Sequence, residues 1–164
     1  MEQDKKIKDE TLIDGQLRLE AHVDKTFYEN NEVQKDLING MMKSETVGCS
    51  YADKTITLAF PVQPWQANRA GILHGGIICV AFDMTLAALA RFYAGENFAP
   101  TVSLDVKYVR PAEVGDSIMV TAKAVAAGKR LTQLTCEAVS KNTGKIIATG
   151  ASVYMNVDTV KERK

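Results

Sequence analysis

The sequence is poor in cysteine and has no excess of either charge, and both shortages narrow the classes of protein it can belong to. Twenty basic and twenty acidic side chains cancel, so there is no electrostatic reason to expect a nucleic acid or an anionic membrane as partner. The three cysteines, at positions 49, 79 and 136, are odd in number and lack metal-ligand spacing. With no signal peptide in the sequence, we expect a reducing cytoplasm, no disulfide framework and no bound metal.

The chain also lacks an uninterrupted hydrophobic run of the length that a membrane span needs. Residues 71–94 are largely apolar, but His74, Asp83 and Arg91 interrupt them. Placing these side chains in lipid is costly, so we expect no membrane partner and interpret the stretch as a core helix. The sequence has no internal repeat and no low-complexity linker.

The N-terminal part differs in composition from the rest. Residues 1–25 are rich in Lys, Glu and Asp with little apolar periodicity, which predicts a polar N-terminal arm that is mobile or a short peripheral segment. Residues 26–164 are long enough for a single domain with a full core. Within them, helical spacing of Val33, Leu37, Ile38 and Met41 predicts a short amphipathic helix.

Most of the remaining chain has the pattern of strands around one helix. Strands are predicted over residues 46–51, 54–62, 101–110, 116–127, 131–141 and 145–157. The turns Gly128-Lys129-Arg130 and Asn142-Thr143-Gly144 are typical of hairpins, so the strands pair antiparallel. The fold class is therefore α+β, with an antiparallel sheet that must wrap around the helix to bury it.

The helix predicted from Gly75 to Ala94 carries the main functional signal. It is apolar on every side except at Asp83 and Thr85, and a helix of that kind is buried. A carboxylate there is desolvated, so it needs either a structural partner or a chemical task. Gly75 and Gly76 leave backbone N–H groups uncovered at the positive end of the helix, where an anionic oxygen is favoured. Together these are the two halves of a hydrolytic site.

A distance argument separates the two halves. Gly75 and Asp83 are eight positions apart, which is roughly 12 Å along a helix that rises about 1.5 Å per residue. An oxyanion donor must lie about 3 Å from the reacting oxygen, so one chain cannot easily supply both groups to one carbonyl. If both are catalytic, the enzyme is at least a dimer with two equivalent sites.

Several motifs in order along the chain point to a known family. They are Asn68-Arg69-Ala70-Gly71-Ile72-Leu73-His74-Gly75-Gly76, Asp83, Val102-Ser103-Leu104-Asp105, Tyr108-Val109-Arg110-Pro111-Ala112, Gly115-Asp116, Gly128-Lys129, and residues 142–150. This set resembles the hotdog-fold acyl-CoA thioesterases, in particular the phenylacetate-degradation (PaaI-like) branch and its relatives in animals. The resemblance covers about residues 45–157 and implies a hotdog fold.

The resemblance implies a role for each matching residue. The Gly75 amide, helped by Asn68, polarises the thioester carbonyl, and Asp83 of the partner subunit activates water or attacks directly. Ser103 matches a hydroxyl that orients the water and the carboxylate, with Thr101 as the alternative. Candidate substrate-binding residues are Gly76, Gly128, Lys129 and Arg130. No cofactor is implied, because water and a carboxylate suffice against a thioester.

Other roles stay open for four of these residues. His74 is either the general base or, by bonding the backbone, an organiser of its loop. Asn68 is either a donor to the substrate or a loop stabiliser. Lys129 and Arg130 either contact CoA phosphates or are solvated charges.

The sequence thus predicts an acyl-CoA thioesterase that works as a homodimer or as a dimer of dimers, a homotetramer, with shared active sites. A non-catalytic acyl-CoA-binding or sensor protein of the same fold is the alternative, although the presence of Asp83 argues against it. A hotdog dehydratase would pair a histidine with a carboxylate. The sequence offers no second candidate histidine for that role, because His22 lies in the polar arm. No residue in segment 93–100 is diagnostic of the acyl group.

Overall fold

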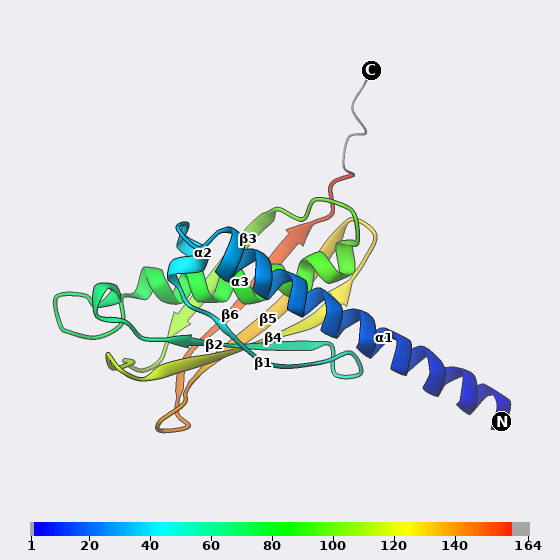
Figure 1. The fold of residues 1–164 in the computed structure, drawn as a ribbon, viewed down its shortest axis with the longest axis horizontal. Coiled ribbons are helices and arrows are strands. Elements are labelled where there is room, and N and C mark those ends of the chain that lie inside the picture. The colour runs from blue at the N-terminus through cyan, green and yellow to red at the C-terminus, as the bar shows by residue number, and fades with distance from the viewer. Residues whose placement is uncertain (1, 159–164) are drawn as a thin grey trace, which may run out of the picture.

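A computed structural model describes the backbone of residues 2–158 and the side chains of residues 11–158 (Figure 1). Its helices are α1 (Glu2–Tyr28), α2 (Ile38–Met41) and α3 (Gly75–Ala94), with short turns of π and 3-10 helix at Glu29–Val33 and Pro64–Gln66. Its strands are β1 (Glu45–Ser50), β2 (Thr55–Pro61), β3 (Thr101–Tyr108), β4 (Ser117–Ala127), β5 (Leu131–Ser140) and β6 (Ile146–Met155).

The strands form one six-stranded sheet in the order β1-β2-β4-β5-β6-β3, and every neighbouring pair is antiparallel. The predicted α+β class and the predicted strands are confirmed. The β4–β5 and β5–β6 hairpins turn at the two places that the sequence marks. β3 follows α3 in the chain but pairs with β6, so it lies at one edge of the sheet (Figure 1).

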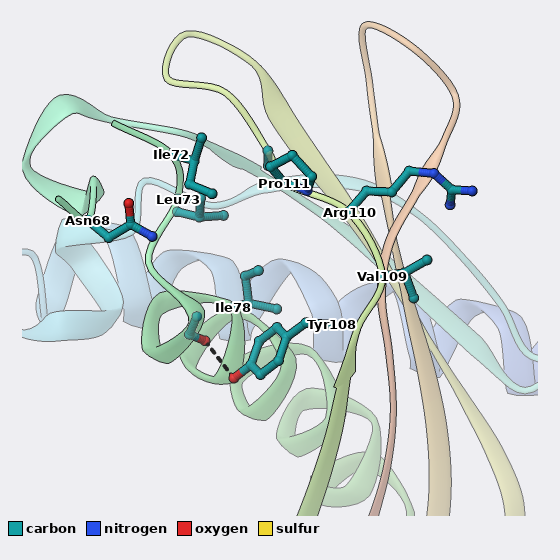
Figure 2. Close-up of a pocket in the computed structure, with 10 residues that line it drawn as sticks. Asn68, Ile72, Leu73, Ile78, Tyr108, Val109, Arg110 and Pro111 are labelled. Carbon is teal, nitrogen blue, oxygen red and sulfur yellow. Dashed lines mark hydrogen bonds between the residues drawn. The ribbon is translucent and has the colours of Figure 1, made fainter. Parts of the chain in front are cut away.

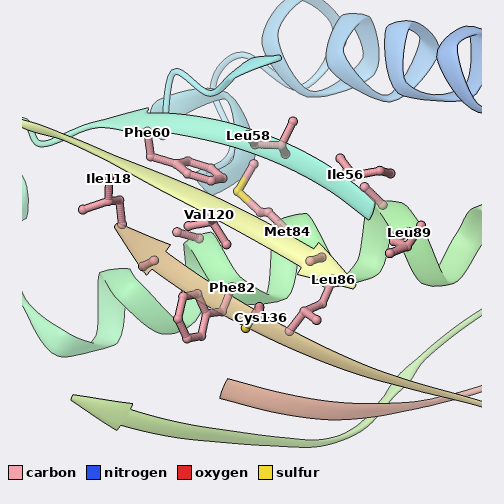
Figure 3. Close-up of a cluster of buried hydrophobic side chains, with 14 of the residues drawn as sticks. Ile56, Leu58, Phe60, Phe82, Met84, Leu86, Leu89, Ile118, Val120 and Cys136 are labelled. Carbon is pink, nitrogen blue, oxygen red and sulfur yellow. The ribbon is translucent and has the colours of Figure 1, made fainter. Parts of the chain in front are cut away.

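The helix α3 crosses the concave face of this sheet and supplies much of the core. Figure 3 shows α3 side chains meeting those of β2, β4 and β5; the labelled members are Ile56, Leu58, Phe60, Phe82, Met84, Leu86, Leu89, Ile118, Val120 and Cys136. A Cβ on Gly150 of β6 would lie 2.9 Å from the Phe82 ring, so this glycine lets helix and sheet approach closely. α3 has the length and composition of a membrane span, yet over half of it is buried inside the protein.

The N-terminal segment is a helix, where the sequence predicts a mobile or peripheral arm. The second half of α1 packs on the domain, because Leu19 and Val23 are 1% and 3% exposed and join the core. The Gln16 amide donates to the Cys49 carbonyl at 3.1 Å and accepts from the Tyr51 N–H at 2.8 Å, which ties α1 to β1. The boundary at residue 25 stays a prediction, but residues on the arm side share the core.

The amphipathic helix predicted near residues 33–41 is also wrong. The chain there forms the end of a π turn and the single short turn α2. The apolar side chains that suggested a buried face are 44–65% exposed; they are Val33, Leu37, Ile38 and Met41. Spacing alone suggested a buried face here, but no part of the described chain packs over it.

Candidate active site

The N-terminus of α3 presents one backbone donor that the chain leaves unused. His74 precedes the helix in extended conformation, and its Nδ1 accepts a hydrogen bond from the Gly76 N–H at 2.9 Å. Within residues 2–158 the Gly75 N–H donates to no acceptor. A helix N-terminus with a free amide is suited to a negatively charged oxygen. Of the two glycines, Gly75 is thus the one that can serve as an oxyanion donor.

The same hydrogen bond indicates the role of the His74 side chain. For Nδ1 to accept, the ring must be in the tautomer that carries its proton on Nε2. Its Nδ1 lone pair is then occupied by the Gly76 amide rather than by a water or a substrate. This is the loop-organising role, and it leaves Nε2–H as the group that His74 can offer to a ligand.

Asn68 organises its loop and also leaves a donor free. Its Oδ1 accepts from the Ala70 N–H at 2.8 Å, which is a local turn typical of asparagine. Its side-chain NH2 group has no partner among the described residues. Figure 2 shows Asn68 on one side of a pocket of about 390 Å³ that Gly75 and Ile78 also line. The loop and donor roles are therefore compatible, because they use different atoms.

Tyr108 also lines this pocket; it stands in one of the ordered motifs of the sequence, but no role is predicted for it there. Its hydroxyl donates to the Gly75 carbonyl at 3.2 Å (Figure 2). The same hydroxyl lies 3.2 Å from the Cys79 Sγ. The Cys79 hydrogen bond, with some burial, raises the pKa of the Tyr108 hydroxyl, so it remains a donor. A Cβ at Gly75 would lie 3.1 Å from the ring. Tyr108 thus holds the carbonyl of the same residue whose N–H is free. The two residues are 33 positions apart in the chain, so the fold is needed to reveal this contact.

Asp83 is held by two hydroxyl groups on one of its oxygens. Thr101 Oγ1 and the Tyr154 hydroxyl both donate to Oδ1 at 2.8 Å. Burial, and next the charge of Asp83, raise the pKa of Tyr154, which keeps its proton on the donor. Oδ2 has no partner among the described residues. The carboxylate is therefore oriented through one oxygen, while the other is available to accept a proton or to attack.

The two halves of the predicted site do not meet within one chain. Asn68 and Gly75 line the pocket at the start of α3, whereas Asp83 lines a separate cavity of about 370 Å³ with Thr101 and Tyr154. Both halves lie on one unbroken helix, eight residues apart, so they are separated by roughly 12 Å along its axis. Within one chain, Gly75 lines one cavity and the Asp83 carboxylate lines another.

Comparison with known proteins identifies the family of this chain. A model of the thioesterase superfamily matches residues 70–147. Acyl-coenzyme A thioesterase 13 of Homo sapiens is 31% identical over 128 residues, which cover 71% of this chain and 89% of that protein. The chain belongs to the thioesterase superfamily. The family predicted from the ordered motifs is confirmed.

Solved structures of this superfamily share the fold. Zebrafish thioesterase superfamily member 2 superposes with a TM-score of 0.71 at 23% identity, over 82% of this chain and 95% of that one. The PaaI protein from the phenylacetic acid degradation operon of E. coli gives a TM-score of 0.67 at 16% identity, over 81% and 94% of the two chains. The hotdog fold is therefore confirmed.

Within this thioesterase fold, Ser103 does not contact Asp83. A bulge between Thr101 and Ser103 interrupts the β3–β6 register. The Ser103 carbonyl accepts a hydrogen bond from Ser152 Oγ at 2.5 Å. The hydroxyl on the carboxylate belongs to Thr101, the alternative considered from sequence. Tyr154, the second donor, was missed because it is fifty-three positions further along, on the strand that pairs with β3.

The basic hairpin lines neither of the two cavities. Gly128 N–H donates to the Leu131 carbonyl at 2.9 Å, and the Asn156 amide donates to the carbonyls of Gly128 and Lys129 at 3.1 and 3.3 Å. The turn is thus well held, while the side chains of Lys129 and Arg130 are exposed. Figure 1 places this turn near the C-terminal end of α3, away from Gly75.

His22 gives no support to a dehydratase. Its Nε2 lies 2.8 Å from the Ala88 carbonyl on α3, and its ring packs edge-on against Phe92. Burial lowers the pKa of His22, which favours the neutral ring that this packing needs. The histidine bonds a carbonyl rather than a catalytic carboxylate, so its contacts are those of helix packing.

Two Asn68 variants separate its roles. Asn68→Ala removes both atoms, and Asn68→Asp keeps the Oδ1 acceptor for Ala70 but loses the NH2 donor. We expect both to lower kcat by about ten- to a hundredfold with a smaller change in KM, because a donor to the oxyanion acts mainly in the transition state. Steady-state kinetics with one acyl-CoA measure this, with Asn142→Ala in a distant hairpin as the control. If Asn68→Asp kept wild-type kcat, Asn68 would be a loop residue alone.

Proposed function

We propose that this protein hydrolyses acyl-CoA thioesters to a carboxylic acid and free CoA, at sites that two copies of the chain build together. The observation that carries the proposal is the pair of unused groups on α3, the Gly75 N–H and the Asp83 Oδ2. A donor for a developing oxyanion and an oriented carboxylate are what acyl transfer to water requires. Membership of the thioesterase superfamily supports the same reaction.

The reaction follows from these groups. The thioester oxygen accepts hydrogen bonds from the Gly75 N–H and the Asn68 NH2 group, which stabilise the negative charge that develops on it. Asp83 Oδ2 takes a proton from water as the water oxygen attacks the carbonyl carbon, or attacks that carbon itself. When the tetrahedral intermediate collapses, the C–S bond breaks and the CoA thiolate recovers a proton. In the base route, that proton comes from the Asp83 carboxyl group. In the direct route the thiolate takes its proton from solvent water, and a second water then hydrolyses the mixed anhydride between the acyl group and Asp83, which releases the carboxylic acid and restores the carboxylate.

Pairing of two copies of the chain through the edge strand β3 brings the Gly75 half of the site close to the Asp83 half. Tyr108, beside Gly75, and Thr101, beside Asp83, stand at opposite ends of β3, about 23 Å apart at 3.3 Å per residue. If two β3 edges pair antiparallel about a two-fold axis, Tyr108 of one copy approaches Thr101 of the other. Val102 and Tyr108 are both 57% exposed on this edge, which suits an interface. A homodimer, or a dimer of dimers, in the cytoplasm is our proposal.

The direct test is release of free thiol from a panel of aryl- and alkyl-CoA esters. We expect the wild-type protein to hydrolyse at least one of them catalytically, without added metal or redox cofactor. Binding of acyl-CoA with no turnover on any member of the panel would instead favour the non-catalytic acyl-CoA-binding protein. Sedimentation in the same buffer gives the oligomeric state, and a fully active monomer would contradict shared sites.

The hairpin Gly128–Arg130 is expected to contact CoA phosphates. Neutralising Lys129 and Arg130 together should raise KM for an acyl-CoA several-fold, because each removes a charge-assisted hydrogen bond. The same acyl group on N-acetylcysteamine, which lacks phosphates, should be hydrolysed as by the wild type. The double variant Lys54→Gln/Lys123→Gln, in the β1–β2 turn and on β4, is the matched control. Equal losses on both substrates would place the two side chains away from the nucleotide.

A further inference from the structure

The cavity beside Asp83 continues along α3 for two further turns. Asp83, Ala87 and Arg91 are spaced by four residues and line it from one face of the helix. The opposite walls come from the segment before β3 and from α2. The remaining lining is mostly apolar; it consists of Asn39, Met84, Phe98, Ala99, Pro100, Thr101 and Tyr154. The cavity thus has a carboxylate at one end, an apolar middle and a guanidinium at the other end.

The guanidinium of Arg91 has no anionic partner among the side chains that the structure describes. Its Nε donates to the Ala87 carbonyl at 3.3 Å, one turn back along α3, so the side chain lies towards Asp83 rather than away from it. No carboxylate of the described part of the chain lies within ion-pair distance of Arg91. A cation at this end of a helix also suits the helix dipole. The helix dipole explains a cation at this position. It does not explain why one cavity joins that cation to Asp83.

We propose that this cavity holds the acyl chain and that Arg91 binds a carboxylate at its far end. The preferred substrates are then ω-carboxyacyl thioesters, the monothioesters of dicarboxylic acids. This inference rests on the proposed thioesterase function and names its substrate class. Arginine suits the role because its planar guanidinium binds a carboxylate through two parallel hydrogen bonds. The negative charge of Asp83 disfavours the reverse orientation of such a chain.

The geometry limits the length of the chain. The Arg91 backbone is roughly 12 Å from Asp83 along the helix, and its side chain returns by about one turn of 5.4 Å. The terminal carboxylate therefore lies about 6 to 12 Å from the thioester carbon. Because an extended chain advances by somewhat less than a bond length of about 1.5 Å per carbon, acyl groups of about six to ten carbons span this distance.

The test compares two acyl groups of equal length with and without the terminal charge. We expect wild-type kcat/KM for adipyl-CoA to exceed that for hexanoyl-CoA by about ten- to a hundredfold, the range for a hydrogen bond to a charged group. Arg91→Met keeps an unbranched stem and removes the charge, so it should abolish this preference and leave hexanoyl-CoA within about twofold of wild type. Arg91→Lys should keep part of the preference, and Arg18→Met, on the exposed face of α1, should keep all of it.

N-acetylcysteamine thioesters of the same two acyl groups identify the anion that Arg91 binds. The adipyl preference, and its loss in Arg91→Met, should persist on these substrates because they carry no phosphate. A loss confined to CoA esters and equal for both acyl groups would assign Arg91 to a CoA phosphate and overturn the inference. Equal wild-type rates for adipyl- and hexanoyl-CoA would overturn it too. Failure of the proposed function itself would look different, since no thioester would then be hydrolysed.

Discussion

Asp83→Asn is expected to lower turnover of the best acyl-CoA by about two to four orders of magnitude while the protein stays folded. The variant is nearly isosteric. Its amide oxygen, placed at Oδ1, still accepts from Thr101 and Tyr154, as the carboxylate does at 2.8 Å. The substitution changes Oδ2, the carboxylate oxygen without a partner among the described residues, into an NH2 group. The substitution thus removes the proton acceptor, or the nucleophile, and little else.

The measurement is single-substrate kinetics by thiol release, with thermal unfolding followed in parallel. Asp53→Asn is the matched control, because Asp53 lies in the exposed β1–β2 turn and its carboxylate accepts from Ser50 Oγ at 2.8 Å. We expect this control to turn over at the wild-type rate. An Asp83→Asn enzyme with near wild-type turnover would make Asp83 a structural carboxylate, held by two hydroxyl groups for packing alone.

The structure shows which part of this site the sequence could predict. The extent of α3 and the position of Asp83 on it followed from local pattern, because an apolar run bounded by glycines specifies a buried helix. The partners of Asp83 did not. Thr101 and Tyr154 reach the carboxylate only because β3 pairs with β6, and strand order is a property of the whole fold. The family resemblance favours the hydroxyl of Ser103, but Thr101 makes the contact with Asp83, and a bulge between Thr101 and Ser103 interrupts the β3–β6 register at this point.

The N-terminal helix shows a different limit. The abundance of charged residues over 1–25 predicts a polar arm. The composition of a whole segment does not reveal the few positions that make tertiary contacts, which here are Gln16, Leu19 and Val23. These positions contact β1 and the core on one narrow face of α1. Conversely, the spacing of Val33, Leu37, Ile38 and Met41 predicted a buried face that is exposed in this chain. Tertiary contacts decide both cases.

Mixing two chains with impaired activity is expected to restore activity if the sites are shared. An Asp83→Asn chain keeps Asn68 and Gly75, and an Asn68→Ala chain keeps Asp83. In a mixed dimer, one of the two sites draws an intact Asn68 from the first chain and an intact Asp83 from the second. Random exchange makes half of the dimers mixed, so roughly a quarter of wild-type activity is the ceiling that two-fold symmetry allows. The activity of the Asn68→Ala homodimer, measured alone, is subtracted.

The control for this experiment is a chain that carries both substitutions. Mixed with the Asp83→Asn chain, it supplies no intact Asp83 to any site, so activity should stay at the level of the Asp83→Asn protein. Subunit exchange is verified by tagging one chain and recovering mixed dimers. Because Gly75 and Asp83 are fixed roughly 12 Å apart on one rigid helix, a site within one chain would need a different base or a different donor. If activity is not restored although exchange is proven, the shared site is contradicted. The hypothesis that Gly75 and Asp83 act on the same thioester is then contradicted as well.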